Sequence, residues 1–243
     1  MTRKRRLGDV LIEKGFAKNK NDAFVIVTEG AVRVDGRKAV SPAEMIEAGT
    51  EITVRAGNGY VGRGAYKLES ALQNFSVPVE GKVCADIGAA TGGFTEVLLR
   101  RGARKVYAID TARGKLAYKI RSDPRVIVME RSDVRAIEAL AEKIDLAVMD
   151  VSLISLRDIL PSAARLLRAD GEAVALFKPQ YEARDPALLS HGIVKNTEER
   201  EKLVADFRAW THTHSWRIMG EMESPIRGTR GNTEYLFYLN ILS

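Results

Sequence analysis

Residues 83–94 read Val83-Cys-Ala-Asp-Ile-Gly-Ala-Ala-Thr-Gly-Gly-Phe94, an apolar strand pattern that runs directly into a loop with three glycines. Glycine lets the backbone approach a ligand closely, and a helix that starts after such a loop favours a negative group at its N-terminus. The following residues, 93–101, have helical periodicity. The stretch therefore predicts a strand, a ligand-binding loop and a helix.

The same alternation continues on the C-terminal side of this unit. Further apolar strands are expected at 106–109, 126–129, 146–149 and 173–177, and helices at 93–101, 113–121, 135–142 and 155–168. Alternating strands and helices favour a parallel sheet covered by helices on both faces. Near the end, Trp216–Met222 and Tyr235–Leu239 flank a Pro/Gly loop, which is typical of an antiparallel pair. We therefore expect a Rossmann-like α/β sheet, mostly parallel with an antiparallel edge strand.

The N-terminal quarter has a different pattern. It predicts helices at 7–14 and 21–29, the second with Ala23, Phe24 and Val27 inward, and strands at 31–34 and 51–55. Asp35-Gly36 is a hairpin-turn signal. The expected organisation is a small α+β domain at 1–56, a glycine-rich linker at 57–64 and the α/β domain at 65–243.

Composition excludes several classes of protein. Of the 243 residues 45% are hydrophobic, and the one cysteine, Cys84, allows no internal disulfide or thiolate metal cluster. No apolar run approaches the ~20 residues of a membrane span, and the basic start Met1–Arg6 lacks the apolar core of a signal peptide. These features predict a cytoplasmic protein without a metal. The net charge of +6 favours a nucleic-acid partner.

The ligand loop favours S-adenosylmethionine over a dinucleotide. Its glycines do not form the G-x-G-x-x-G pattern, but Asp86 stands two residues before Gly88. Asp110, after the second strand, can bond ribose hydroxyls, and Asp133, after the third, can face an adenine amine. The predicted cofactor-binding residues are Asp86, Gly88, Ala89, Thr91, Gly92, Gly93, Phe94, Asp110 and Asp133.

Four further charged residues stand where a core would not place them: Lys67, Asp150, Lys178 and Glu234. A ribose 2′-hydroxyl is a weak acid, so methyl transfer to it requires groups that remove or offset its proton. Lysines stabilise a developing alkoxide, and one can act as a base if its pKa is lowered from about 10.4. The two carboxylates would orient the lysines. These four are the predicted catalytic residues.

These motifs resemble the TlyA (haemolysin A) family of rRNA 2′-O-methyltransferases, in which an S-four-type RNA-binding domain precedes an FtsJ-like methyltransferase domain. The resemblance rests on segments 6–12, 31–36, 63–68, 86–95, 150–156, 178–180, 224–225 and 231–234. It implies that Lys67, Asp150, Lys178 and Glu234 form a Lys-Asp-Lys-Glu tetrad. It also implies methylation of cytidine riboses in small- or large-subunit rRNA, or in both.

Ribosomal RNA or ribosomal subunits are therefore the expected partner. The residues expected to bind RNA are Arg3, Lys4, Arg5, Arg6, Lys18, Lys20, Arg33, Arg37, Lys38 and Arg63. Three alternatives stay open: an RNA-binding protein with an inactive catalytic half, which requires that the tetrad does not converge; a haemolysin, after the family's older name; and a NAD-linked dehydrogenase. The sequence does not fix the oligomeric state.

Overall fold

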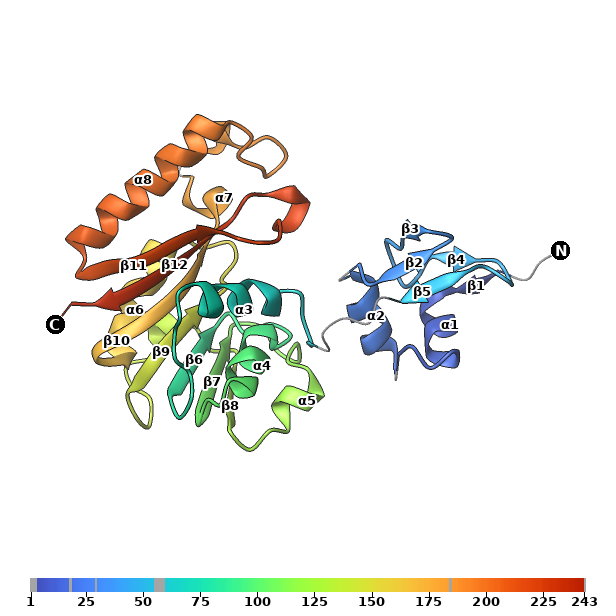
Figure 1. Ribbon diagram of the computed structural model, residues 1–243, viewed down its shortest axis with the longest axis horizontal. Coiled ribbons are helices and arrows are strands. Elements are labelled where there is room, and N and C mark those ends of the chain that lie inside the picture. The colour runs from blue at the N-terminus through green and yellow to red at the C-terminus, as the bar shows by residue number, and fades with distance from the viewer. Residues whose placement is uncertain (1–3, 18, 29, 55–59, 184, 243) are drawn as a thin grey trace. The chain divides into compact units, whose positions relative to one another are not determined.

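The computed structural model describes residues 4–17, 19–28, 30–54, 60–183 and 185–242 (Figure 1). The chain divides into two compact units, Met1–Arg63 and Gly64–Ser243. Of the residues expected to bind RNA, Arg3 and Lys18 lie outside the described residues, as do residues 57–59 of the expected linker.

The smaller unit contains two helices and short antiparallel strands. Its elements are β1 (Arg5–Arg6), α1 (Leu7–Glu13), α2 (Lys20–Thr28), β2 (Val32–Val34), β3 (Arg37–Lys38), β4 (Met45–Ile46) and β5 (Ile52–Val54). Strand β2 pairs with β3 and β5, and β1 pairs with β4. Asp35 and Gly36 have φ values of 48° and 75°, the left-handed conformation that a type I′ hairpin turn requires. The predicted helix–helix–hairpin unit is present.

One side chain of α2 lies on the opposite side from the one predicted. Ala23 and Val27 are buried in the core of the small unit, as expected, but Phe24 is 54% exposed. Position 24 is turned by about 100° of helical rotation from position 23, and in this unit the covered side of α2 ends at the Ala23–Val27 stripe. The expectation that Phe24 points inward was wrong.

The larger unit is built on a seven-stranded sheet in the order β11-β12-β10-β9-β6-β7-β8. The strands are β6 (Val83–Ile87), β7 (Lys105–Asp110), β8 (Val126–Glu130), β9 (Ile144–Met149), β10 (Leu167–Phe177), β11 (Trp216–Glu223) and β12 (Tyr235–Ile241). Strands β6 to β10 run parallel, and β12 is antiparallel to both β10 and β11. The predicted Rossmann-like, mostly parallel sheet is confirmed; its antiparallel strand, β12, lies second from the edge, with β11 outside it.

Helices cover both faces of this sheet (Figure 1). They are α3 (Ala65–Asn74), α4 (Gly93–Arg100), α5 (Tyr118–Arg121), α6 (Leu156–Leu166), α7 (Pro179–Glu182) and α8 (Thr197–Thr213), with short 3-10 turns at Val134–Ala136, Pro186–Leu188 and Thr229–Gly231. The main core joins one face of the sheet to α6 and α8, through side chains such as Leu160 and Phe207. Helices α3 and α4 pack against each other away from this core.

Two predicted helices differ from the observed ones. The helix expected at 113–121 begins only at Tyr118, because Gly114 has a φ of +69° and donates its N–H to the Glu130 carboxylate at 2.8 Å. The helix expected at 135–142 is reduced to the turn Val134–Ala136, since Ile137 is extended. Helices α3 and α8 were not predicted.

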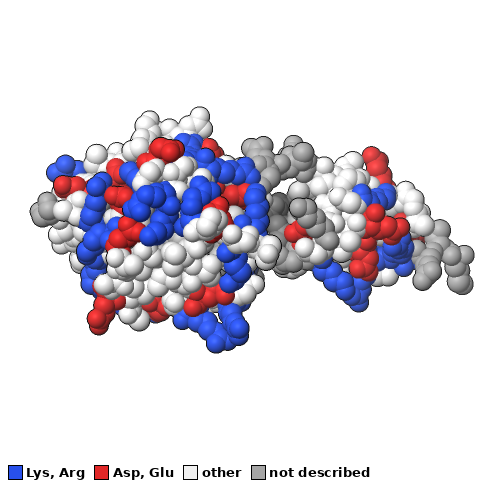
Figure 2. Space-filling view, turned by 90° about the horizontal axis from the view of Figure 1, so that it is seen from below, with Lys and Arg blue, Asp and Glu red and all other residues white. Residues whose placement is uncertain are grey.

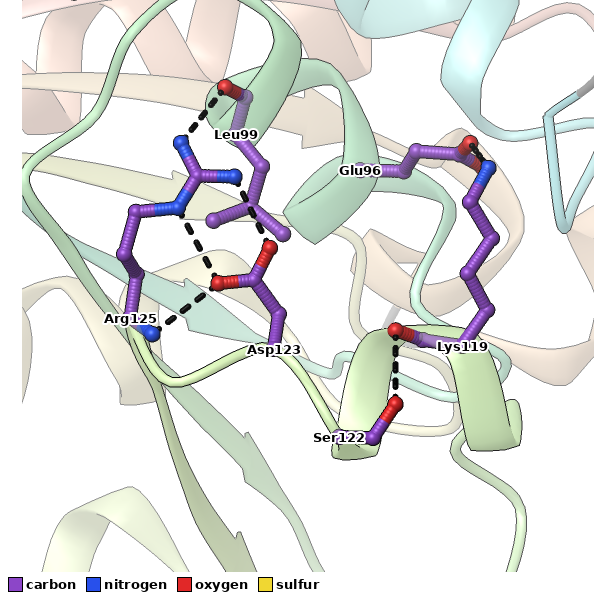
Figure 3. Close-up of polar contacts among 6 residues, drawn as sticks. All are labelled: Glu96, Leu99, Lys119, Ser122, Asp123 and Arg125. Carbon is purple, nitrogen blue, oxygen red and sulfur yellow. Dashed lines mark hydrogen bonds and ion pairs between the residues drawn. The ribbon is translucent and has the colours of Figure 1, made fainter.

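Short α5 is held to α4 by polar contacts (Figure 3). The Lys119 ammonium contacts the Glu96 carboxylate at 2.7 Å, and Arg125 donates to the carbonyl of Leu99 at 3.1 Å. Glu96 and Leu99 both lie on α4, the helix that follows the glycine loop. These contacts hold α5 and the loop before β8 against the helix that follows the glycine loop.

Candidate active site

The glycine loop begins where β6 ends, and its first glycine is packed against the neighbouring strand end. Gly88 has a φ of +88°, and a Cβ there would lie 2.6 Å from the carbonyl oxygen of Asp150. Such a distance is shorter than real Cβ contacts allow, so only glycine fits. Gly92, with a φ of +94°, is similarly close to Leu116 and Ile120. The loop path therefore depends on both glycines.

Asp86, near the end of β6 and just before the glycine loop, is hydrogen-bonded to Thr95 in the first turn of α4. Its side chain is fully buried, and one carboxylate oxygen accepts hydrogen bonds from the backbone N–H of Thr95, at 2.9 Å, and from its hydroxyl, at 2.6 Å. The other oxygen has no hydrogen-bond partner among the described residues. Burial raises the pKa of Asp86 from 3.8 to about 7.

This raised pKa gives a testable pH dependence. Because the folded state binds the Asp86 proton more tightly than the unfolded chain, its stabilising effect is complete below pH ~4 and is lost as the pH rises toward 7. Asp86→Asn has no such titration. The free energy of unfolding of the wild type, relative to Asp86→Asn, is expected to fall by up to about 1.4 kcal/mol per pH unit in this range.

Urea unfolding at a series of pH values measures this difference. Asp206→Asn, on an exposed position of α8, is the matched control and should run parallel to the wild type. Parallel profiles for Asp86→Asn as well would mean that Asp86 is ionised in the folded protein.

The two acids after the next strands line a hollow of about 500 Å³. Asp110 accepts from the N–H of Ala112 at 2.7 Å and of Ala90 at 2.8 Å, so it joins its own loop to the glycine loop. Asp133 pairs with Arg135 at 2.6 Å, and the hydrogen bond from Arg135 lowers the pKa of this carboxyl. Both groups are therefore held as acceptors at the wall of the hollow.

The hollow contains part of the predicted cofactor set. Gly88, Asp110 and Asp133 line it, while Asp86, Ala89, Thr91, Gly92, Gly93 and Phe94 are outside its lining. Lining residues that the sequence did not single out include Thr111, Ala112, Lys115, Ser132 and Arg135. Each stands within a few residues of Asp110 or Asp133, so proximity to a strand-end acid was the available signal.

The four predicted catalytic residues come together as two ion pairs. Lys67, on α3, contacts Glu234 at 2.6 Å, and Lys178 contacts Asp150 at 2.5 Å. Lys178 also donates to the carbonyl of Val151 at 2.8 Å. Three of the four side chains are almost fully buried, and Asp150 is 24% exposed and lines the hollow. Buried charges are costly unless they are paired, and here each has a partner.

The sheet brings these pairs to the same place. Phe177 of β10 is opposite Tyr235 of β12, so Lys178, just after β10, lies beside Glu234, just before the antiparallel β12. Asp150 directly follows β9, and β9 pairs with β10 on the side of β10 that faces away from β12. The fit around Glu234 is tight, because a Cβ on Gly228 would lie 1.9 Å from its carboxylate. The two pairs are therefore neighbours at one edge of the sheet.

The cations expected to bind RNA differ in their contacts. Arg5 pairs with Glu13, Arg37 pairs with Glu44, and Arg33 donates to the carbonyl of Gly36 at 2.7 Å. In the larger unit, Figure 2 shows Lys and Arg side chains spread over one face and interleaved with Asp and Glu. Many cations on the molecule are thus already matched by acidic groups.

The described residues were also compared with the requirements for a membrane-spanning helix and for a metal site. No described helix is long and apolar enough to cross a membrane. Within the same residues, no group of three or more His, Cys, Asp or Glu side chains could hold a metal ion.

A mostly parallel seven-stranded sheet with an antiparallel β12, a glycine loop and strand-end acids around a hollow defines a Rossmann-like methyltransferase. Residues 60–241 match the FtsJ-like methyltransferase family, and residues 5–52 match the S4 domain. The chain belongs to the FtsJ-like methyltransferases and, among them, to the TlyA family. The resemblance inferred from the sequence is confirmed.

Relatives over nearly the whole chain support this assignment. The 16S/23S rRNA (cytidine-2′-O)-methyltransferase TlyA of Mycobacterium tuberculosis is 39% identical over 98% of this chain and 91% of its own. Hemolysin A of Brachyspira hyodysenteriae is 36% identical over 97% of this chain and 100% of its own. A solved structure from Streptococcus thermophilus, described as a hemolysin, has a TM-score of 0.79 and 36% identity, and covers 100% of this chain and 90% of that one.

Proposed function

We propose that this protein transfers the methyl group of S-adenosylmethionine to the 2′-hydroxyl of cytidine in ribosomal RNA. The observation that carries the proposal is the pair of buried ion pairs, Lys67–Glu234 and Lys178–Asp150, at the sheet edge beside the hollow. The full-length TlyA relative of Mycobacterium tuberculosis supports the choice of rRNA and of cytidine. Ribosomal subunits are the proposed partner, which places the activity in the cytoplasm.

The residues around the hollow fit the methyl donor. Asp110 presents carboxylate lone pairs to ribose hydroxyls, Asp133 can accept from the adenine amine, and Gly88 lets the backbone lie close to the ligand. When bound, the donor supplies an electrophilic methyl group on its sulfonium. We assign Asp86, Gly92 and the rest of the loop to shaping this site rather than to touching the ligand.

The proposed chemistry uses the Lys178–Asp150 pair at the 2′-oxygen. With the donor bound, the oxygen–carbon bond would form as the sulfur–carbon bond breaks, and the hydroxyl proton would pass to the Lys178–Asp150 pair, in which the Asp150 carboxylate is the acceptor while the lysine is an ammonium. An ammonium has three donors, and the contacts of Lys178 with Asp150, Val151 and Ser152 hold its Nζ in place. The Lys67–Glu234 ion pair sets the electrostatic potential beside the Lys178–Asp150 pair. Alignment and charge supply most of the acceleration.

The domains have separate proposed tasks. Residues 1–56 bind RNA, residues 65–243 transfer the methyl group, and the segment between them links the two. Lys4, Lys38 and Arg63, with the other cations of the predicted set, would contact phosphates.

Methyl transfer is tested with labelled S-adenosylmethionine and unmodified ribosomal subunits, followed by mass spectrometry of the nucleosides. A 2′-O-methylcytidine that is absent with Lys178→Ala is the expected result. Donor binding without transfer to either subunit, or to naked rRNA, would contradict the proposal and favour an RNA-binding protein with an inactive catalytic half. The convergence of the four charged side chains counts against that alternative.

A further inference from the structure

The loop between β9 and α6, residues 150–155, carries the groups that orient Lys178. The Lys178 Nζ donates to the carbonyl oxygen of Val151 at 2.8 Å and to the hydroxyl of Ser152 at 3.0 Å. Its ion pair with Asp150 is formed at the start of the same loop. The path of the loop therefore decides where the ammonium is held.

This loop has an unfavourable backbone conformation at its most exposed residue. Leu153 has a φ of +66°, in the left-handed region, and is 87% exposed. A residue other than glycine in this region costs about 1–3 kcal/mol and persists only where the surrounding structure imposes it. The exposed side chain adds little packing of its own, so contacts at the ends of the loop impose the path.

A buried carboxylate supplies these contacts at the far end of the loop. Glu182, the last residue of α7, is 3% exposed. One of its oxygens accepts from the hydroxyl of Ser155 at 2.5 Å, and the other accepts from the backbone N–H of Leu156 at 2.7 Å. Ser155 is the N-cap of α6 and Leu156 its first residue, where the helix leaves N–H groups without internal partners. Burial raises the pKa of Glu182, and the bonds from Ser155 and Leu156 oppose this rise.

Glu182 and Lys178 belong to one short segment, residues 178–182. Lys178 contacts the first part of the loop 150–155, and Glu182 contacts its end, so the segment holds the loop at two places. Between these places, Leu153 and Ile154 line both the 500 Å³ hollow and a neighbouring hollow of about 360 Å³. A shift of the loop would therefore alter the site as well as the contacts of Lys178.

We propose that Glu182 is a positioning residue for methyl transfer, because it fixes the end of the loop 150–155 and thereby holds the acceptors that orient the Lys178 ammonium. The inference rests on the proposed function, in which Lys178 acts at the 2′-oxygen. Glu182 is outside the lining of the 500 Å³ hollow and acts through the loop rather than on the ligand.

The test compares single-turnover rates of methyl transfer to ribosomal subunits at saturating S-adenosylmethionine. Glu182→Ala is expected to lower the rate about 10- to 100-fold, the effect of a displacement on the order of 1 Å at the reacting groups. In a Lys178→Ala background the same substitution should have almost no further effect, because the group that the loop positions is already absent. A merely structural role would lower the rate by the same factor in both backgrounds.

Further variants keep the test independent of the folding of Glu182→Ala. Glu182→Gln has the same shape, can accept from the N–H of Leu156 and can donate to the hydroxyl of Ser155, so it should retain most of the rate. Ser155→Ala removes one of the two bonds and should have an intermediate effect that also disappears with Lys178→Ala. Glu201→Ala, at an exposed glutamate of α8, is the matched control and should have the wild-type rate. Melting temperatures check that each variant folds.

Three outcomes overturn the inference: a wild-type rate for Glu182→Ala, equal factors in the two backgrounds, or a folded Glu182→Gln as slow as the alanine variant. If Glu182→Ala does not fold, Ser155→Ala decides in the same two backgrounds. Each of these outcomes leaves transfer by the wild type, and so the proposed function, untouched. Absence of transfer by the wild type contradicts the proposed function and this inference with it.

Discussion

Lys178→Ala is expected to reduce the single-turnover rate of methyl transfer by about 10²- to 10⁴-fold, with the affinity for S-adenosylmethionine almost unchanged. The rate loss follows from the removal of a group that is positioned at the reacting oxygen, whether it takes the proton or stabilises the charge. The donor affinity should persist because Lys178 is outside the lining of the 500 Å³ hollow, although its partner Asp150 belongs to it.

Rapid-quench measurement of the rate and calorimetry of donor binding test the two halves of this expectation. Lys202→Ala, which removes an exposed lysine from α8, is the matched control and should have wild-type values for both. Loss of donor affinity to the same extent as the rate would move Lys178 to the cofactor site.

Lys178→Arg then distinguishes the two chemical roles. A guanidinium is always charged and cannot accept a proton, but it keeps the positive field. A rate near that of the wild type would assign an electrostatic role to Lys178. A rate as low as that of the alanine variant, with the fold intact, would favour proton transfer.

The sheet and the strand-end charges could be read from the sequence because both are local signals. Apolar runs such as Val83–Ile87, which only Asp86 interrupts, are typical of strands buried on both faces, and the observed β6 has these same bounds. Parallel strands end at one edge, so Asp150 and Lys178, which follow neighbouring strands, were expected to lie close together. Local pattern and topology together predict this part of the site.

Other features depend on tertiary contacts that a local pattern does not contain. Lys67 and Glu234 are separated by 167 residues, and only the packing of α3 brings them together. Gly114, near the start of the expected helix 113–121, is held in a loop by its hydrogen bond to Glu130 at the end of β8. Phe24 was placed inward with Ala23 and Val27, and only the packing of the folded small unit shows that its side of this face is left uncovered.

Gly88→Ala is expected to lower the affinity for S-adenosylmethionine by at least about tenfold and to destabilise the fold by roughly 2–6 kcal/mol. The φ of +88° is unfavourable for alanine, at about 1–3 kcal/mol, and overpacking of a tight contact adds about 1–3 kcal/mol. The added methyl would meet the backbone of Asp150 at 2.6 Å, so the glycine loop and the strand end that carries this carboxylate must move apart. The glycine loop and Asp150 both line the hollow, and Asp150 is also the ion-pair partner that orients Lys178.

Gly81→Ala separates backbone strain from this collision. Gly81 has a φ of +72°, but a Cβ there has no atom within 4 Å, so alanine introduces the strain without the contact. Calorimetric melting and donor titration of the two variants should show a small loss of stability with normal affinity for Gly81→Ala, and the full effect for Gly88→Ala. If both variants lost the same stability and neither lost donor affinity, the close approach of Gly88 to Asp150 would have no part in building the site. In that case a shift of the glycine loop away from Asp150 would not affect donor binding, and the other residues of the loop would be the ones that bind the donor.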